Sequence, residues 1–146
     1  MLNFLRDMKV LRVANAAAAA QTDIVTSVVD TRGYDSVAFI AALGDVTDAS
    51  VLGLTVSTNN ADSTIGATET KAKAEHTADP SDADNNLLVV DVNKPRQRYA
   101  FATLSRGTAD AVVDGIFAVL YNSNERPVEI DATVVASGFF NDPADA

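Results

Sequence analysis

The chain has 146 residues, a formal net charge of −9 at pH 7 and no cysteine. This length fits one domain with a sizeable core, and the lack of cysteine excludes disulfides, thiol nucleophiles and thiolate metal sites. The acidic balance argues against nucleic acid as a partner, because phosphate binding needs basic surface. No apolar run approaches the roughly 18 residues of a membrane-spanning helix, so we expect no membrane contact.

The first 22 residues differ in charge and spacing from the rest of the chain. Met1–Val13 carries three basic residues and one acidic residue, and its apolar residues recur at about helical spacing. One interpretation is a terminal segment that lies on its own domain. The other is an extended or helical N-terminal arm, residues 1–22, that docks on a neighbouring protein. Such an arm would bind through three apolar and three basic side chains: Leu2, Phe4, Leu5, Arg6, Lys9 and Arg12.

From Asp23 onward the apolar residues recur at every second position, as in half-buried β-strands. Asp30–Gly33 supplies a turn with a glycine that can adopt positive φ. Short strands separated by turn residues predict an all-β fold over residues 23–146, an antiparallel β-sandwich or a small barrel of jelly-roll type. The predicted strands are Ile24–Val29, Ser36–Leu43, Val51–Thr58, Leu87–Val92, Arg98–Leu104, Val112–Tyr121 and Val128–Ala136.

Residues 59–86 are polar and form a long acidic loop in this prediction. The span Gly44–Asn86 holds eight acidic residues against Lys71 and Lys73, which is typical of a solvated face. A structureless connection of this length is unusual in a compact domain. The alternative is therefore an edge hairpin within the loop, with Thr64–Ile65 and Thr68–Lys73 as its strands.

The residue types needed for catalysis do not occur in a recognisable pattern. Asp82, Asp84 and Asn86 resemble the start of a calcium loop, but the glycine and the glutamate that complete the pattern are missing. His76 is the single histidine, so it has no second histidine with which to share a metal. No G-x-S-x-G, Walker or G-x-G-x-x-G motif is present. We predict a protein that is not an enzyme and has no catalytic, cofactor-binding or metal-binding residues.

Lys94–Tyr121 predicts a hairpin whose first strand is basic and whose second strand is apolar on both faces. One explanation is a central strand covered by the opposite sheet and by a loop. The other is that a neighbouring copy covers the second face, with Arg96, Arg98 and Arg106 pairing across the boundary. The residues predicted for that subunit interface are Arg98, Phe117, Val119 and Tyr121.

Three segments together resemble a family of small head-decoration, or capsid cement, proteins of tailed bacteriophages. The segments are TDIVTSVVDTRGYDSVAFIAALG, LLVVDVNKPRQRYAFATLSRGT and AVVDGIFAVLYNSNERPV, and the likeness covers about residues 22–128. The residues that carry it are Asp30, Gly33, Tyr34, Asp35, Leu43, Gly44, Asp91, Pro95, Arg98, Tyr99, Arg106, Asp114, Gly115, Tyr121 and Pro127.

The resemblance implies a β-rich structural protein without a cofactor, which bridges subunits of the major capsid protein lattice. It also implies a homotrimer on the outer surface of the virion, present in the host cytoplasm before assembly. Two alternatives stay open. One is a structural protein of the phage neck or tail, which differs from a decoration protein in copy number. The other is a ligand-binding module or a cryptic hydrolase that uses the acidic loop around His76.

Overall fold

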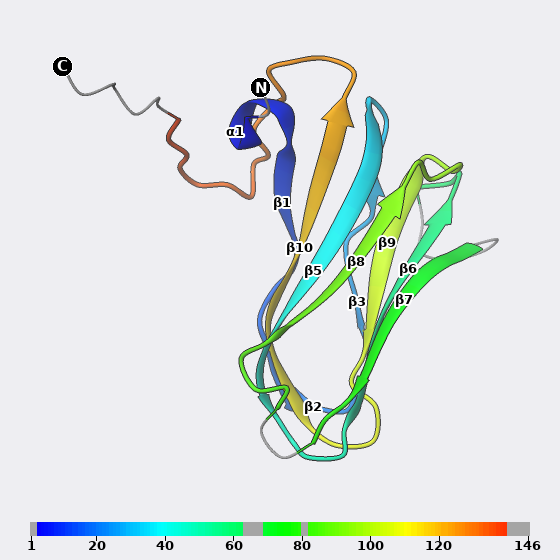
Figure 1. The fold of residues 1–146 in the computed structure, drawn as a ribbon, viewed down its shortest axis with the longest axis vertical. Helices are drawn as coiled ribbons and strands as arrows, with labels where there is room; N and C mark the ends of the chain where they lie inside the picture. Colours follow the sequence, from blue (N-terminus) through cyan, green and yellow to red (C-terminus); the bar gives the residue numbers. More distant parts are fainter. Residues whose placement is uncertain (1–2, 63–68, 80–81, 140–146) are drawn as a thin grey trace.

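The computed structural model, which describes residues 3–62, 69–79 and 82–139, is a sandwich of two antiparallel sheets (Figure 1). Sheet A has the order β1-β10-β5-β8, and β2 also pairs with β10. Its strands are β1 (Lys9–Ala14), β2 (Ala17–Ala20), β5 (Tyr34–Val46), β8 (Leu87–Asn93) and β10 (Ala111–Ser123).

Sheet B faces sheet A and has the order β3-β9-β6-β7, with β4 also pairing with β9. Its strands are β3 (Ile24–Val25), β4 (Val29–Asp30), β6 (Val51–Asn59), β7 (Glu69–Thr77) and β9 (Tyr99–Ser105). The single helical turn of the described chain is α1 (Phe4–Asp7). The predicted β-sandwich is thus confirmed, and the sheets do not close into a barrel.

The core lies between the sheets because alternate residues of each strand point inward. Phe39 on β5 and Ile116 on β10 are fully buried, opposite Leu54 on β6 and Leu104 on β9. The pairing of β10 with β5 shifts register between Val113 and Gly115. This irregularity places Val113 inward, fully buried, although the sequence pattern assigned it to the same face as Phe117.

Residues 9–20, predicted as part of an N-terminal arm, are strands at the edge of sheet A. β1 pairs with β10 from Lys9↔Leu120 to Ala14↔Ile116, and Val13 is 4% exposed. Helical spacing near the N-terminus therefore describes α1 alone. Because β1 and β2 pair with β10 of the same chain, they agree with the interpretation in which this segment lies on its own domain. Leu2 lies outside the described residues.

Of two further segments, the first agrees in part with the edge-strand alternative and the second contradicts a predicted strand. The acidic loop 59–86 contains β7, which pairs with β6 as an edge strand, whereas its other candidate strand, Thr64–Ile65, lies outside the described residues. Val128–Ala136 is not a strand, despite its regular alternation. It instead forms a turn in which the Val134 N–H donates to the Asp131 carbonyl oxygen at 3.0 Å. None of the described helices is long and apolar enough to cross a membrane.

Candidate interaction surfaces

The outward face of sheet A is apolar across all four of its main strands. One row of directly opposed residues runs Arg12, Phe117, Ile40 and Val89, from β1 to β8. Opposed residues of antiparallel strands lie on the same side of a sheet. We call this surface the sheet A face and define it by nine residues: Val10, Arg12, Ala38, Ile40, Ala42, Leu87, Val89, Phe117 and Val119.

The side chains of the sheet A face are open to solvent to different degrees. Leu87 is 59% exposed and Val89 is 51% exposed, while Ile40, Phe117 and Val119 are half-buried. A contiguous apolar surface of this kind marks a contact with another molecule more often than isolated exposed apolar residues do. Two predicted interface residues, Phe117 and Val119, therefore lie together on this face.

Tyr121, the third predicted interface residue, forms a polar border to the sheet A face. Its hydroxyl lies 2.5 and 2.7 Å from the two carboxylate oxygens of Asp91 and donates to that carboxylate. Burial, followed by the hydrogen bond to Asp91, raises the pKa of Tyr121 above its usual 10.0. The phenol thus stays protonated and ties β10 to β8 across β5.

Lys9 and Arg12, predicted for a capsid-binding arm, are held on the body of the sandwich. The Arg12 guanidinium lies 5.3 Å from the Phe117 ring centroid and donates to the Asp114 carbonyl oxygen at 2.9 Å. Lys9 pairs with Asp131 at 3.8 Å. Arg12 therefore covers part of Phe117 and belongs to the sheet A face.

A second apolar surface lies at the end of the sandwich that carries α1, which we call the α1 end. Phe4 is 52% exposed, Ile130 is 42% exposed and Phe139 is 54% exposed. A pocket of about 330 Å³ is lined at this end by Leu5, Arg6, Pro127, Val128, Ile130, Ser137 and Phe139. Three predicted arm residues, Phe4, Leu5 and Arg6, thus gather here.

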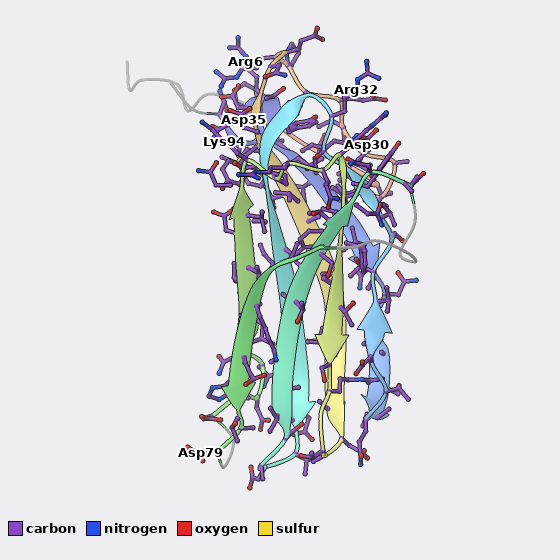
Figure 2. The ribbon with its side chains drawn as sticks, turned by 90° about the vertical axis from the view of Figure 1, so that its right-hand side faces the viewer. Arg6, Asp30, Arg32, Asp35, Asp79 and Lys94 are labelled. Atoms are coloured by element: carbon purple, nitrogen blue, oxygen red, sulfur yellow. The ribbon has the colours of Figure 1, made fainter. Side chains whose placement is uncertain are left out.

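The α1 end also carries cationic side chains. Figure 2 shows Arg6, Arg32 and Lys94 at this end of the sandwich, together with Asp30 and Asp35, and shows Asp79 at the opposite end. Arg6 and Lys94 are exposed, and within the described part of the chain neither forms an ion pair. The α1 end therefore combines apolar contact area with exposed charges of both signs.

Arg98 lies away from the other three residues of the predicted subunit interface. Its guanidinium donates to both carboxylate oxygens of Asp30 at 2.9 and 2.8 Å, and it lies 4.9 Å from the Tyr99 ring centroid. These contacts belong to sheet B, whereas Phe117 belongs to sheet A. The hydrogen bond from Arg98 lowers the pKa of Asp30 below its usual 3.8. The structure thus divides the predicted set between two sheets.

Arg106 was a candidate for pairing across a subunit boundary, but it is 4% exposed. Its guanidinium donates to the carbonyl oxygens of Ala18, Thr22 and Ala111 at 2.6, 2.7 and 3.0 Å. Its hydrogen bonds therefore link Ala18 and Thr22 to the β9–β10 connection. No sequence signal distinguishes this buried arginine from its exposed neighbours, because the acceptors are backbone atoms of distant residues.

The region around His76 has the contacts of a turn. His76 Nε2 lies 3.1 Å from Asp82 Oδ2, and both side chains are largely exposed. Asp82 and Asp84 accept backbone N–H hydrogen bonds from Asp79 and Val46 at 2.9 and 2.8 Å. The residues with calcium-like spacing, Asp82, Asp84 and Asn86, therefore lie in the connection between β7 and β8, where the two carboxylates accept backbone hydrogen bonds. Across residues 3–62, 69–79 and 82–139 no group of three or more metal-ligating side chains is present.

No protein-family model matches the sequence, and no curated protein matches it. Solved structures share the fold. A chain in the structure of the infectious bursal disease virus Gx strain superposes with a TM-score of 0.50 at 13% identity, covering 82% of this chain and 33% of the viral chain. This chain therefore spans well under half of the viral chain that it matches.

Two further solved structures match at lower TM-scores. The Eiger TNF of S. frugiperda gives 0.42 at 13% identity, covering 81% of this chain and 99% of that one. The CBM22-1–GH10 modules of Clostridium thermocellum xylanase 10B give 0.43 at 11% identity, covering 92% of this chain and 30% of that one. At these identities the likeness to the viral chain establishes the β-sandwich fold, which this chain shares with a virion component.

Proposed function

We propose that this chain is a structural virion protein that decorates a tailed-phage capsid and stabilises it by bridging subunits of the major capsid protein. The observation that carries the proposal is the sheet A face, an apolar surface that a solitary copy leaves open to water. The segment resemblance to decoration proteins supports the phage assignment, and the fold shared with a viral chain supports a virion role. In this proposal the protein is not an enzyme and needs no cofactor.

Bridging requires at least two contact surfaces, and the molecule offers two that are apolar. The α1 end, with Phe4, Leu5 and Arg6, is the proposed contact with the capsid lattice. The sheet A face, with Phe117 and Val119, is the proposed contact between copies in a homotrimer. The α1 end lies at one end of the sandwich and the sheet A face lies on its side. One copy could therefore contact a lattice subunit and a second copy at the same time.

The stabilisation would be physical. Separating bridged capsid subunits must also expose the apolar area that the bridge buries, at about 25 cal/mol per Å². An interface of roughly 1,600 Å² corresponds to tens of kcal/mol gross, and association costs offset most of this gain. A small net gain repeated over a whole shell would resist pressure from packaged DNA. The proposed location is the outer surface of the virion, reached from the host cytoplasm.

Capsids that lack this protein test the proposal. Purified protein is added to them, and the bound copies per major capsid subunit and the temperature of DNA release are measured. We expect binding in numbers comparable to the major capsid protein and a higher release temperature. A dozen copies or fewer per particle would favour the neck or tail instead. Absence of binding would refute the capsid assignment.

A matched pair of variants locates the lattice contact. Phe4 at the α1 end and Val25 on β3 are both 52% exposed, so either can be replaced without emptying the core. We expect Phe4→Asp to weaken capsid binding by about tenfold or more, the range of a well-packed interface residue. Val25→Asp should bind like the unmodified protein. Equal binding by both variants would remove the α1 end from the proposed contact.

A further inference from the structure

The segment after β10 has the sequence of a strand but no strand partner. Val128, Ile130, Ala132, Val134 and Ala136 alternate with other residues, and most of them have moderate or high strand preference. In the structure Val128 is anchored, because its N–H donates to the Arg6 carbonyl oxygen at 2.8 Å.

The chain from Val135 to Phe139 is open to solvent. Val135 is fully exposed and Phe139 is 54% exposed. Within the described residues, Val135–Phe139 forms no hydrogen bond with the rest of the chain. We call Val134–Phe139 the tail. Phe139 lines the pocket at the α1 end of its own copy, whereas Val135 is fully exposed in a solitary copy, which points to a partner on another molecule.

Within the described residues, β8 offers an edge that is hydrogen-bonded to no second strand, and β7 lies near its start, where His76, Leu87 and Leu88 line one pocket. The other edge of β8 pairs with β5. Natural edge strands are usually blocked by lysine, proline or a bulge. β8 has none of these three, its one charged side chain is Asp91, and Leu87 and Val89 are its most exposed large side chains. The corresponding edge of sheet B, β7, carries Lys73 and Glu75.

The first three residues of the tail cannot reach β8 of their own copy. β1 and β8 are opposite edges of sheet A, and the Thr133 hydroxyl accepts a 2.9 Å hydrogen bond from the Arg12 N–H on β1. Strands lie about 4.8 Å apart, so the position beyond β8 is about 19 Å from β1. An extended chain needs about six residues for that distance. Val134, Val135 and Ala136 follow Thr133 too closely.

We propose that the tail of one copy adds as a strand to the open edge of β8 in a second copy. This inference rests on the proposed contact between copies and names the elements that make it. Main-chain hydrogen bonds would supply affinity, and alternate tail side chains would join the apolar row around Val89. Donor and acceptor lie at opposite edges of the same sheet, so the contact is head-to-tail and closes into a ring when its rotation allows.

Cross-linking tests the tail contact directly because the chain has no cysteine of its own. Val89→Cys protein is mixed with Val134→Cys, Val135→Cys or Ala136→Cys protein, and the mixture is oxidised. Residues opposed on adjacent strands lie close enough for a disulfide. We expect at least one mixture to form a disulfide dimer containing one chain of each type, several-fold above the Thr108→Cys control. Thr108 is exposed on the β9–β10 connection, away from this edge.

Other cross-linking results would overturn the proposal. Equal yields with Thr108→Cys and with all three tail variants would do so. Dimers of Val89→Cys alone, in preference to mixed dimers, would instead indicate that β8 pairs with β8 of another copy. Val135 is fully exposed, so Val135→Cys should fold normally and its cross-linking yield reports the contact alone.

Light scattering on a variant ending at Thr133 gives a second readout. We expect the mass to fall from that of an oligomer to that of one chain. An oligomer of unchanged mass, or an intact protein that is monomeric at every concentration tested, would overturn the inference. Capsid binding is measured separately on the same samples. If the intact protein is a monomer and still binds capsids, the tail contact is removed and the capsid assignment stands. If the intact protein is an oligomer that depends on the tail but does not bind capsids, the reverse holds.

Discussion

The guanidinium of Arg106 donates two hydrogen bonds to Thr22, at 2.7 Å to its carbonyl oxygen and at 2.9 Å to its hydroxyl. These residues are far apart in the chain, and Arg106 is nearly fully buried, with no carboxylate partner among the residues that the structure describes. Its charge is instead solvated by backbone carbonyls. The contact closes the end of the sandwich opposite α1.

We therefore expect Arg106→Ala to lower the free energy of unfolding by at least about 3 kcal/mol, since several charge-assisted hydrogen bonds are lost and buried carbonyls are left unpaired. Arg106→Lys should recover part of this loss, because an ammonium keeps the charge but lacks the planar fork. Denaturant unfolding measures both. Exposed Arg96 is the control, and Arg96→Ala should stay within about 0.5 kcal/mol. Equal losses for Arg96→Ala and Arg106→Ala would contradict this role.

Two glycines with positive φ should respond differently to alanine. Gly33 has φ +90 and open space where an alanine Cβ would lie, so Gly33→Ala should cost about 1–2 kcal/mol from backbone strain alone. At Gly107, φ is +64 and a Cβ would lie 1.9 Å from the Val51 carbonyl oxygen. Gly107→Ala should therefore cost clearly more, with displacement of the β9–β10 connection from β6. Thermal unfolding of both variants checks the order, and a smaller loss for Gly107→Ala would refute it.

The Asp30–Arg98 pair should make stability depend on pH in the acid range. The hydrogen bond from Arg98 lowers the pKa of Asp30 below 3.8, so the folded protein favours the carboxylate. The resulting stabilisation is present above the pKa of the unfolded chain and is lost as pH falls through the folded pKa. The gain is small because both side chains are partly exposed.

Asp30→Asn should therefore be slightly less stable than the unmodified protein at neutral pH, and the difference should vanish well below pH 3.8. Urea unfolding across this range measures it. Asp35→Asn, at an exposed carboxylate of the same end, is the control and should show no comparable convergence. A difference that grows as the pH falls would reverse the assigned sign.

The two outward faces of the sandwich should differ in their response to a lysine. Val119 lies on the sheet A face, and Thr55 lies on the outward face of sheet B, with both half-buried. We expect Val119→Lys to weaken self-association by about tenfold or more, because it places a charge in an apolar contact. Thr55→Lys should associate normally. Sedimentation or light scattering over a dilution series distinguishes them, and the opposite pattern would move the contact to sheet B.

Removal of residues 1–20 should prevent stable folding. The deletion takes away β1 and β2, together with buried Val13, and exposes the edge of β10. The loss should exceed about 5 kcal/mol, which is the whole stability of many domains. Circular dichroism and denaturant unfolding test this. A truncated protein with a normal unfolding transition would show that these strands are dispensable.

Much of the fold could be predicted from local pattern. Period-two alternation in Ser36–Leu43 and Val51–Thr58 identified parts of β5 and β6, because one face of each strand is buried in the core. The same reasoning placed Phe117 and Val119 together on one face of β10, and they lie together on the sheet A face. It assigned Val113 to that face as well, because a register shift is invisible in a simple alternation.

The candidate surfaces were only partly predictable. Phe4, Leu5 and Arg6 gather at the α1 end as a set, whereas Lys9 and Arg12 are held by Asp131 and by the Asp114 carbonyl. Arg98 and Arg106 read as equivalent basic residues in the sequence. Their roles differ because Asp30 lies beside one of them and backbone carbonyls surround the other. These partners come from segments distant in the chain.

The residue pattern alone was enough to establish an all-β protein with two inward-facing apolar surfaces, because alternation at period two is a local property of each strand. Long-range packing then selected which patterned segments became strands. Residues 9–14 found the edge of β10, whereas Val128–Ala136, with the more regular alternation, found no edge in its own copy. The physical reason is that a strand is completed by hydrogen bonds to a neighbour, and the neighbour is chosen by the whole fold.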